Sequence, residues 1–274
     1  MMNIITLFQY GFIQRAFITG IFVALLCSTL GLFLVLRRLS LIGDGLSHVS
    51  FGAIAIGLFL GIYPLFVAIP LVILSSLAIL RLTEKAKVYG DAAIGILSSV
   101  ALAVGVILAS TSHGFTVDLF SYLFGNILAI SSFEMIISIV LSLVVLFILY
   151  LFYYDLVSLS FNEQLAQIGG VSTKKINILL VILTAITVVL SVRVVGIMLI
   201  SSLLILPSVT ALQIARSFRG ALLLSSLSAV TALLLGVVVS FIVNIPTGAT
   251  VVLINFLFFL LALTHNSLIP LMKK

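Results

Sequence analysis

Charged side chains are scarce in this sequence of 274 residues, because only 7% of them are Asp, Glu, Lys or Arg. A soluble domain of this size needs far more charge to cover its surface. The sequence also has a single cysteine, Cys27, so no intrachain disulfide and no cluster of thiolate metal ligands can form within one chain. These shortages exclude an ordinary soluble domain and a disulfide-stabilised one.

Three motifs of common enzyme classes are also missing. The chain has no G-x-x-x-x-G-K-[ST] segment and therefore lacks the loop that cradles the phosphates of ATP. It has no H-E-x-x-H and no G-x-S-x-G, which removes two frequent hydrolase signatures. We therefore expect no catalytic residues and no permanently bound cofactor, and any energy from ATP has to come from another polypeptide.

Apolar residues dominate what is present, at 63% of the chain, with a mean hydropathy of +1.47. Runs of about 20 apolar residues recur, and each can cross a hydrocarbon layer about 30 Å thick as a helix. The sequence therefore predicts an all-α membrane protein, with residues 1–274 forming one transmembrane domain of about nine spans. We expect the spans at residues 15–36, 41–61, 64–81, 92–110, 132–153, 178–193, 195–213, 220–243 and 249–265.

The positive charges predict how these spans are oriented. If the connection at 36–41 is cytoplasmic and the spans alternate, eleven of the thirteen Lys and Arg residues lie on the cytoplasmic side, and only Arg15 and Arg193 lie outside. This excess follows the positive-inside rule. It places the amino terminus outside and the carboxyl terminus inside, and it explains the basic net charge without a nucleic-acid partner.

An acid and a histidine stand close together at the start of the second predicted span. Asp44 and His48 are four residues apart, so a helix places them on one face, about 6 Å apart along its axis. Carboxylate oxygen and imidazole nitrogen suit a divalent transition metal, and a two-fold dimer would supply two of each. Alternatively, Asp44 is an ordinary acid at a helix N-terminus and His48 donates to a backbone carbonyl.

Other titratable residues offer weaker candidates for a metal path. His113 and Asp118 lie in the external connection 111–131, where a solvated loop explains them better than a role in receiving a cation. Glu134 is expected to be an acid in the first turn of a span. His265 is expected where the last span meets the cytoplasm.

The connection 154–177 is the longest one on the cytoplasmic side. Within it, Asn162 can cap a short helix whose first turn carries Glu163, and Gly169 with Gly170 can end that helix. An isolated helix of two turns is marginal in water. It therefore needs a surface to pack against, which points to a partner protein.

Five segments in this order resemble the permeases of the zinc, manganese and iron ABC uptake systems, the ABC-3 family, over essentially the whole chain. They are V-L-R-R-L-S-L-I-G-D-G-L-S-H (35–48), G-D-A-A-I-G-I (90–96), L-F-G-N-I-L (123–128), E-Q-L-A-Q-I-G (163–169) and V-G-I-M-L-I-S-S-L-L-I-L-P-S-V-T-A (195–211).

The resemblance implies a homodimeric permease with a fold similar to the vitamin B12-type importers. Its partners would be two cytoplasmic ATPase subunits and an extracytoplasmic metal-binding protein. Asp44 and His48 would be the intramembrane metal-binding pair. The coupling helix would carry Glu163, Ala166 and Gly169 at its motif positions, where it contacts the ATPase.

The sequence indicates the family more specifically than it indicates the transported metal. Manganese members often read S-H-A-x-x-P-G after the acid, whereas this chain reads S-H-V-S-F-G-A (47–53) without the proline, which favours zinc over manganese or iron. Two other functions compete with metal import. One is an ABC permease for a siderophore or cobalamin, and the other is an ion-coupled carrier that works without an ATPase.

Overall fold

The computed structural model describes residues 11–86, 88–111, 122, 125 and 130–268, and these contain helices but no strand. The predicted all-α architecture is confirmed for this part of the chain. Its elements, in chain order, are α2 (Gly11–Leu36), α3 (Ile42–Phe59), α4 (Pro64–Lys85), α5 (Gly90–Thr111), α7 (Ser132–Leu151), α8 (Tyr153–Phe161), α9 (Glu163–Ile168), α10 (Thr173–Val195), η2 (Ile197–Leu199), α11 (Ile200–Ile214), α12 (Phe218–Val243) and α13 (Thr247–Leu268).

Eight of the described helices are long and apolar enough to cross a membrane, and they coincide with eight of the nine predicted spans. The ninth, α11, has 15 residues. It is therefore about 22 Å long at about 1.5 Å per residue, shorter than a hydrocarbon core of about 30 Å. The predicted span 195–213 starts too early, because Gly196 has a φ of 90° and the 3₁₀ turn η2 follows it.

The connection 154–177 contains more helix than the sequence predicted. Helix α8 covers its first residues, α9 lies in its middle, and α10 already begins at Thr173. The predicted short helix is present, because α9 follows Asn162 and ends before Gly169.

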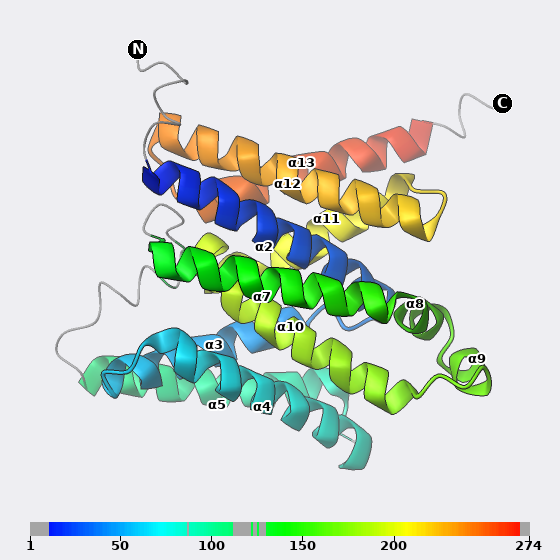
Figure 1. Cartoon of the computed structure of the whole chain (residues 1–274), viewed down its shortest axis with the longest axis horizontal. Coiled ribbons are helices and arrows are strands. Elements are labelled where there is room, and N and C mark those ends of the chain that lie inside the picture. Colours follow the sequence, from blue (N-terminus) through cyan, green and yellow to red (C-terminus); the bar gives the residue numbers. More distant parts are fainter. Residues whose placement is uncertain (1–10, 87, 112–121, 123–124, 126–129, 269–274) are drawn as a thin grey trace.

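The helices form two groups that α10 joins (Figure 1). One group consists of α3, α4 and α5, and the other of α2, α11, α12 and α13. Helix α10 packs against α3 and α4 on one side and against α2 on the other. Helices α2, α3 and α10 are the most buried spans, whereas most of the α5 surface is exposed as it would be to lipid or a partner.

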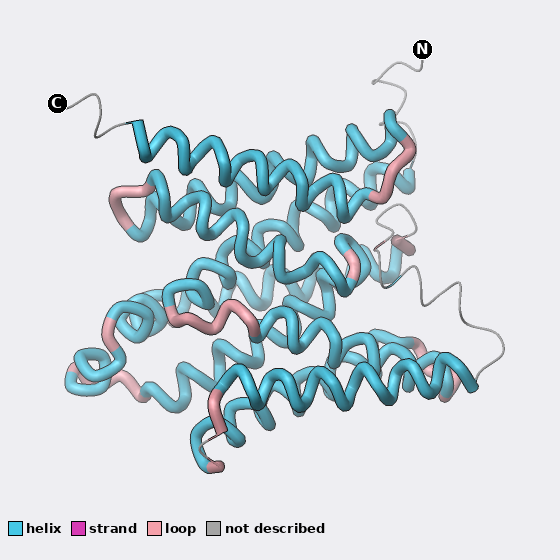
Figure 2. Tube along the Cα trace, turned by 180° about the vertical axis from the view of Figure 1, so that it is seen from behind, coloured by secondary structure: helices cyan, strands magenta, loops and turns pink. Residues whose placement is uncertain are grey.

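The basic connections gather at one end of the bundle. Helices α2 and α4 end there, α10 and α12 begin there, and α9 lies beyond them at the right of Figure 1. Short loops join most of these helices, as Figure 2 shows from behind. The described residues that bring positive charge to this end are Arg37, Arg38, Arg81, Lys174, Lys175, Arg216 and Arg219. This arrangement agrees with the predicted charge separation. Lys87, Lys273 and Lys274 lie outside the described residues.

Small residues allow the helices within each group to approach closely. A Cβ atom built on Gly52 of α3 would lie 3.0 Å from the carbonyl carbon of Ala101 in α5. A Cβ atom on Gly31 of α2 would lie 2.8 Å from the carbonyl carbon of Leu204 in α11. Because backbone atoms occupy both places, neither contact can accept a side chain without moving a helix.

We therefore predict that Gly52→Ala lowers the free energy of unfolding by about 1–3 kcal/mol, the usual cost of overpacking a well-packed core. The matched control is Gly95→Ala in α5, where an added Cβ meets no atom within 4 Å. This control should leave stability unchanged or raise it slightly, because alanine favours a helix over glycine. Thermal unfolding in detergent checks both. Equal melting temperatures for the two variants would contradict the close α3–α5 contact.

Candidate metal site and cytoplasmic contact surface

Asp44 and His48 lie together at the start of α3, as their spacing predicts. The Oδ2 atom of Asp44 is 3.8 Å from Nε2 of His48. Both side chains are partly open at the surface of the single chain, with 52% of Asp44 and 31% of His48 exposed. The carboxylate and the imidazole can therefore reach the same ligand without rearranging α3.

A third polar group approaches Asp44 from a different helix. Ser201, in the first turn of α11, donates a hydrogen bond from its hydroxyl to Oδ1 of Asp44 at 3.1 Å. The sequence analysis missed this contact because 157 residues separate the two positions. Ser201 and Ser202 form a pair of adjacent serines before Pro207, but the local sequence does not indicate which helix Ser201 would contact.

Two other serines near the pair bond within their own helix. The Ser47 hydroxyl donates to the backbone carbonyl of Asp44 at 2.7 Å, and the Ser50 hydroxyl donates to that of Leu46 at 2.8 Å. Both side chains are fully buried. They pack inside the protein, and neither lies open beside the carboxylate and imidazole.

Two glycines bring neighbouring helices against the start of α3. A Cβ atom on Gly43 would lie 2.6 Å from a methyl group of Leu204 in α11, and one on Gly45 would collide with Ile94 in α5. Helix α3 continues unbroken through both. The glycines therefore allow close approach, which holds the Asp44–His48 face in a set position.

One chain supplies too few ligands for a closed metal site. Among the described residues, no group of three or more His, Cys, Asp or Glu side chains could hold a metal ion. Four ligands are usual for a tetrahedral zinc site. Asp44, His48 and Ser201 therefore make an open, incomplete set.

Glu134 and His265, the other described candidates, do not join this set. His113 and Asp118 lie outside the described residues. Glu134 is buried and forms a capping box with Ser131 at the start of α7, which confirms its predicted place in a first helical turn. His265 is exposed near the end of α13, as predicted.

The short helix α9 is capped at both ends. The Asn162 side chain accepts a hydrogen bond from the backbone N–H of Leu165 at 3.1 Å, which satisfies an otherwise free donor of the first turn. At the other end Gly169 is the last capping residue, and Gly170 adopts a φ of 88°, which favours glycine. The local sequence therefore explains both limits of α9.

The residues of α9 divide between an inner and an outer face. Ala166 is buried, and Glu163 contacts Arg37, the residue after α2, at 3.2 Å. Leu165 and Ile168 point away, with 65% and 83% exposed. The resemblance named Glu163, Ala166 and Gly169 as contacts for a partner, and that assignment stays a prediction. The sequence analysis did not single out the exposed apolar residues Leu165 and Ile168.

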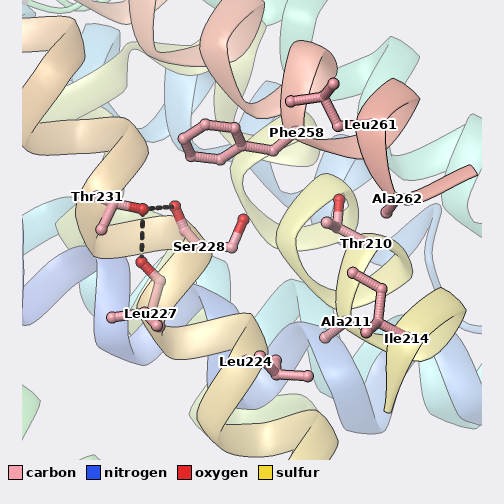
Figure 3. A pocket seen from close by; sticks show the side chains of 10 residues that line it. All are labelled: Thr210, Ala211, Ile214, Leu224, Leu227, Ser228, Thr231, Phe258, Leu261 and Ala262. Carbon is pink, nitrogen blue, oxygen red and sulfur yellow. Dashed lines mark hydrogen bonds between the residues drawn. The ribbon is translucent and has the colours of Figure 1, made fainter. Parts of the chain in front are cut away.

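An apolar hollow elsewhere in the bundle has a different chemistry. Figure 3 shows it between α11, α12 and α13, with a volume of about 310 Å³. Its walls carry no titratable side chain, and the hydroxyl of Thr231 already donates to the backbone carbonyls of Leu227 and Ser228. This hollow does not hold metal ligands.

The long apolar helices and the basic residues gathered at one end of the bundle define a multi-pass membrane protein. Comparison with known proteins identifies its family, because residues 9–266 match the ABC 3 transport family. The chain belongs to this family.

Three similar proteins illustrate the match. The chain is 36% identical to the manganese import system permease protein ScaB of Streptococcus gordonii, over 93% of this chain and 92% of that one. It is 32% identical to the high-affinity zinc uptake system membrane protein ZnuB of Haemophilus influenzae, over 90% and 95%. Its structure resembles PsaBC from Streptococcus pneumoniae, solved with a Fab, with a TM-score of 0.86, 34% identity and coverage of 94% and 93%.

The capping of α9 leads to a prediction that is independent of transport. Asn162→Ala should lower the local stability of α9 by about 1 kcal/mol, because the side-chain acceptor of the first turn is lost. Hydrogen exchange at residues 163–168 should become several-fold faster. Asn162→Asp keeps an acceptor and serves as the control. Equal exchange in the alanine and aspartate variants would show that the cap does not hold this helix.

Proposed function

We propose that this chain is the membrane-spanning subunit of an ATP-driven importer for a divalent transition metal, and that Asp44 and His48 bind the metal during its passage. The Asp44–His48 pair carries the proposal, since it brings a carboxylate oxygen and an imidazole nitrogen within 3.8 Å of each other on an otherwise apolar helix. Acids within membrane spans usually serve a substrate path. The names of the relatives ScaB and ZnuB support a metal as the cargo.

A second copy of the chain would complete the site. The two ligands of one chain are partly exposed at its surface, where lipid would be a costly neighbour for a carboxylate. A two-fold axis beside α3 would cover them and bring together two carboxylates and two imidazoles. This four-ligand set has the number and types of atoms that a divalent transition metal takes.

The choice between zinc and manganese depends on more than these ligands. The missing proline after His48 favours zinc, whereas relatives named for manganese and for zinc both match almost the full chain. Carboxylate and imidazole bind both ions. Zinc is the cargo that we propose from the sequence, and manganese or iron is the alternative.

The energy would come through α9. The chain has no phosphate-binding loop, and α9 presents Leu165 and Ile168 at the end of the bundle where the basic residues gather. We propose that an ABC ATPase subunit covers these two side chains on the cytoplasmic side. An extracytoplasmic metal-binding protein would deliver the metal at the opposite end. An ion-coupled carrier, by contrast, would transport metal without ATP.

The metal-binding role predicts that Asp44→Asn and His48→Gln each lower ATP-dependent uptake of ⁶⁵Zn²⁺ or ⁵⁴Mn²⁺ by at least about tenfold. Even the loss of a group that only orients a metal ligand costs about 10- to 100-fold. Uptake is measured in proteoliposomes that contain the permease, its ATPase and its metal-binding protein.

The controls change the same types of side chain elsewhere. Asp155→Asn in α8 and His265→Ala in α13 should leave uptake unchanged. Wild-type uptake in both site variants would exclude Asp44 and His48 as metal ligands. Uptake that continues without ATP would favour the ion-coupled carrier. Competition between Zn²⁺ and Mn²⁺ in the same assay decides the preferred ion.

The docking role of α9 yields a separate prediction. The double variant Leu165→Ser with Ile168→Ser should weaken binding of the ATPase subunit by about tenfold or more, since burying a leucine or isoleucine contributes about 1.5–3 kcal/mol each. Co-purification of the ATPase with the permease measures this. Leu60→Ser is the control, because Leu60 is an exposed apolar residue after the last turn of α3, at the opposite end of that helix from Arg37 and Arg38. Unchanged co-purification in the double variant would exclude this surface.

A further inference from the structure

Arg37 connects the end of α2 to α8 and α9. Its Nη2 atom contacts Oε2 of Glu163 at 3.2 Å, and its Nη1 atom donates to the backbone carbonyl of Leu159 at 3.5 Å. The Arg37 side chain is largely buried. The other carboxylate oxygen of Glu163 accepts a hydrogen bond from Asn177 of α10 at 3.5 Å. Glu163 therefore joins α9 to two transmembrane helices.

The chain from Arg37 to Asp44 is short and internally bonded. The backbone N–H of Leu39 donates to the carbonyl of Leu34 at 2.8 Å, while Arg38 has a left-handed φ of 58°, so the helix ends in a Schellman-type turn. The N–H of Ile42 then donates to the carbonyl of Leu39 at 3.1 Å and begins α3. A turn with these bonds moves as a unit with the helix ends that it joins.

Asp44 lies just beyond this turn, in the first turn of α3, and is bonded to another helix. Its carboxylate accepts a hydrogen bond from Ser201 of α11. A displacement of the turn relative to α11 would therefore change the surroundings of the Asp44 carboxylate. The hydrogen bond from Ser201 to Asp44 would break or form as the turn moved.

We propose that the Arg37–Glu163 ion pair transmits movement of α9 to Asp44, so that Arg37 is a positioning residue for metal transport. This inference rests on the proposed function. Glu163 is part of this connection inside the permease, while Leu165 and Ile168 form the outer contact with the ATPase. Ala166 is buried, and we expect its packing to keep α9 on the bundle when the ion pair is removed.

A purely structural role explains the pair less well. The Arg37 side chain is largely buried, but the Glu163 side chain is half exposed, so that solvent screens the pair and limits its contribution to folding stability. The inner surface of α9 could be apolar throughout if its only task were to pack. A charged contact that adds little stability but joins three helices suits a connection that is made and broken during a transport cycle.

The test is the number of metal ions imported per ATP hydrolysed by the complete complex in proteoliposomes, with ⁶⁵Zn²⁺ or ⁵⁴Mn²⁺ as the probe. Substitutions along a coupling connection typically change coupling by about 2- to 30-fold. Arg37→Ala and Glu163→Gln should therefore lower the ratio by at least about threefold. ATPase co-purification and the melting temperature should stay as in the wild type. The exchanged pair Arg37→Glu with Glu163→Arg should recover more of the ratio than either charge reversal alone.

Arg38→Asn is the matched control. It removes the neighbouring exposed cation but retains a residue type that tolerates the left-handed φ at this position. Its ratio should equal that of the wild type.

Each remaining outcome is decisive. An unchanged ratio in Arg37→Ala, with normal wild-type transport, would overturn the proposed connection and leave the metal-transport function intact. A lower ratio accompanied by loss of the ATPase or of the fold, without recovery in the exchanged pair, would overturn it in favour of a structural role. A wild-type complex that hydrolyses ATP but imports neither metal would overturn the proposed function itself.

Discussion

A carboxylate on an apolar membrane helix needs polar partners, and this requirement organises the region around Asp44. Its partners come from two directions, because His48 lies one turn further along α3 and Ser201 reaches in from α11. Gly43 and Gly45 let α11 and α5 approach closely enough to hold that turn. The open side of the pair remains for a ligand that neither helix supplies. The surrounding packing thus presents the two proposed metal ligands at the surface of the single chain.

Much of the fold could be predicted from local sequence. Long apolar runs predict α2, α12 and the other long helices because the bilayer requires both their length and their composition. Asn162 and the Gly169–Gly170 pair predict the limits of α9, since capping depends on residues within one turn. The end of α10 was harder to predict from the sequence, because a single glycine, Gly196, turns the chain with a positive φ and shortens the next helix.

The site was predictable only in part, because local sequence determines contacts within one helix but not contacts between helices. Asp44 and His48 are neighbours on one helix, so their spacing alone brings them together. The partners of Asp44 and Glu163 on other helices depend on tertiary packing, since 157 residues separate Asp44 from Ser201 and 126 separate Arg37 from Glu163. The inward face of α9 likewise depends on where α2 and α10 lie. The contact of Glu163 with Arg37 could therefore not be predicted from the sequence, whereas its place at a partner surface stays a prediction.

The central claim is that two copies of the Asp44–His48 pair enclose one metal ion. Equilibrium binding of Zn²⁺ and Mn²⁺ to the purified permease–ATPase complex, combined with X-ray absorption at the metal edge, tests it most directly. The account predicts one ion for every two permease chains, with both nitrogen and oxygen ligands, and loss of this binding when either ligand is substituted. One ion per chain, or an ion whose ligands persist after Asp44 and His48 are both replaced, would contradict it.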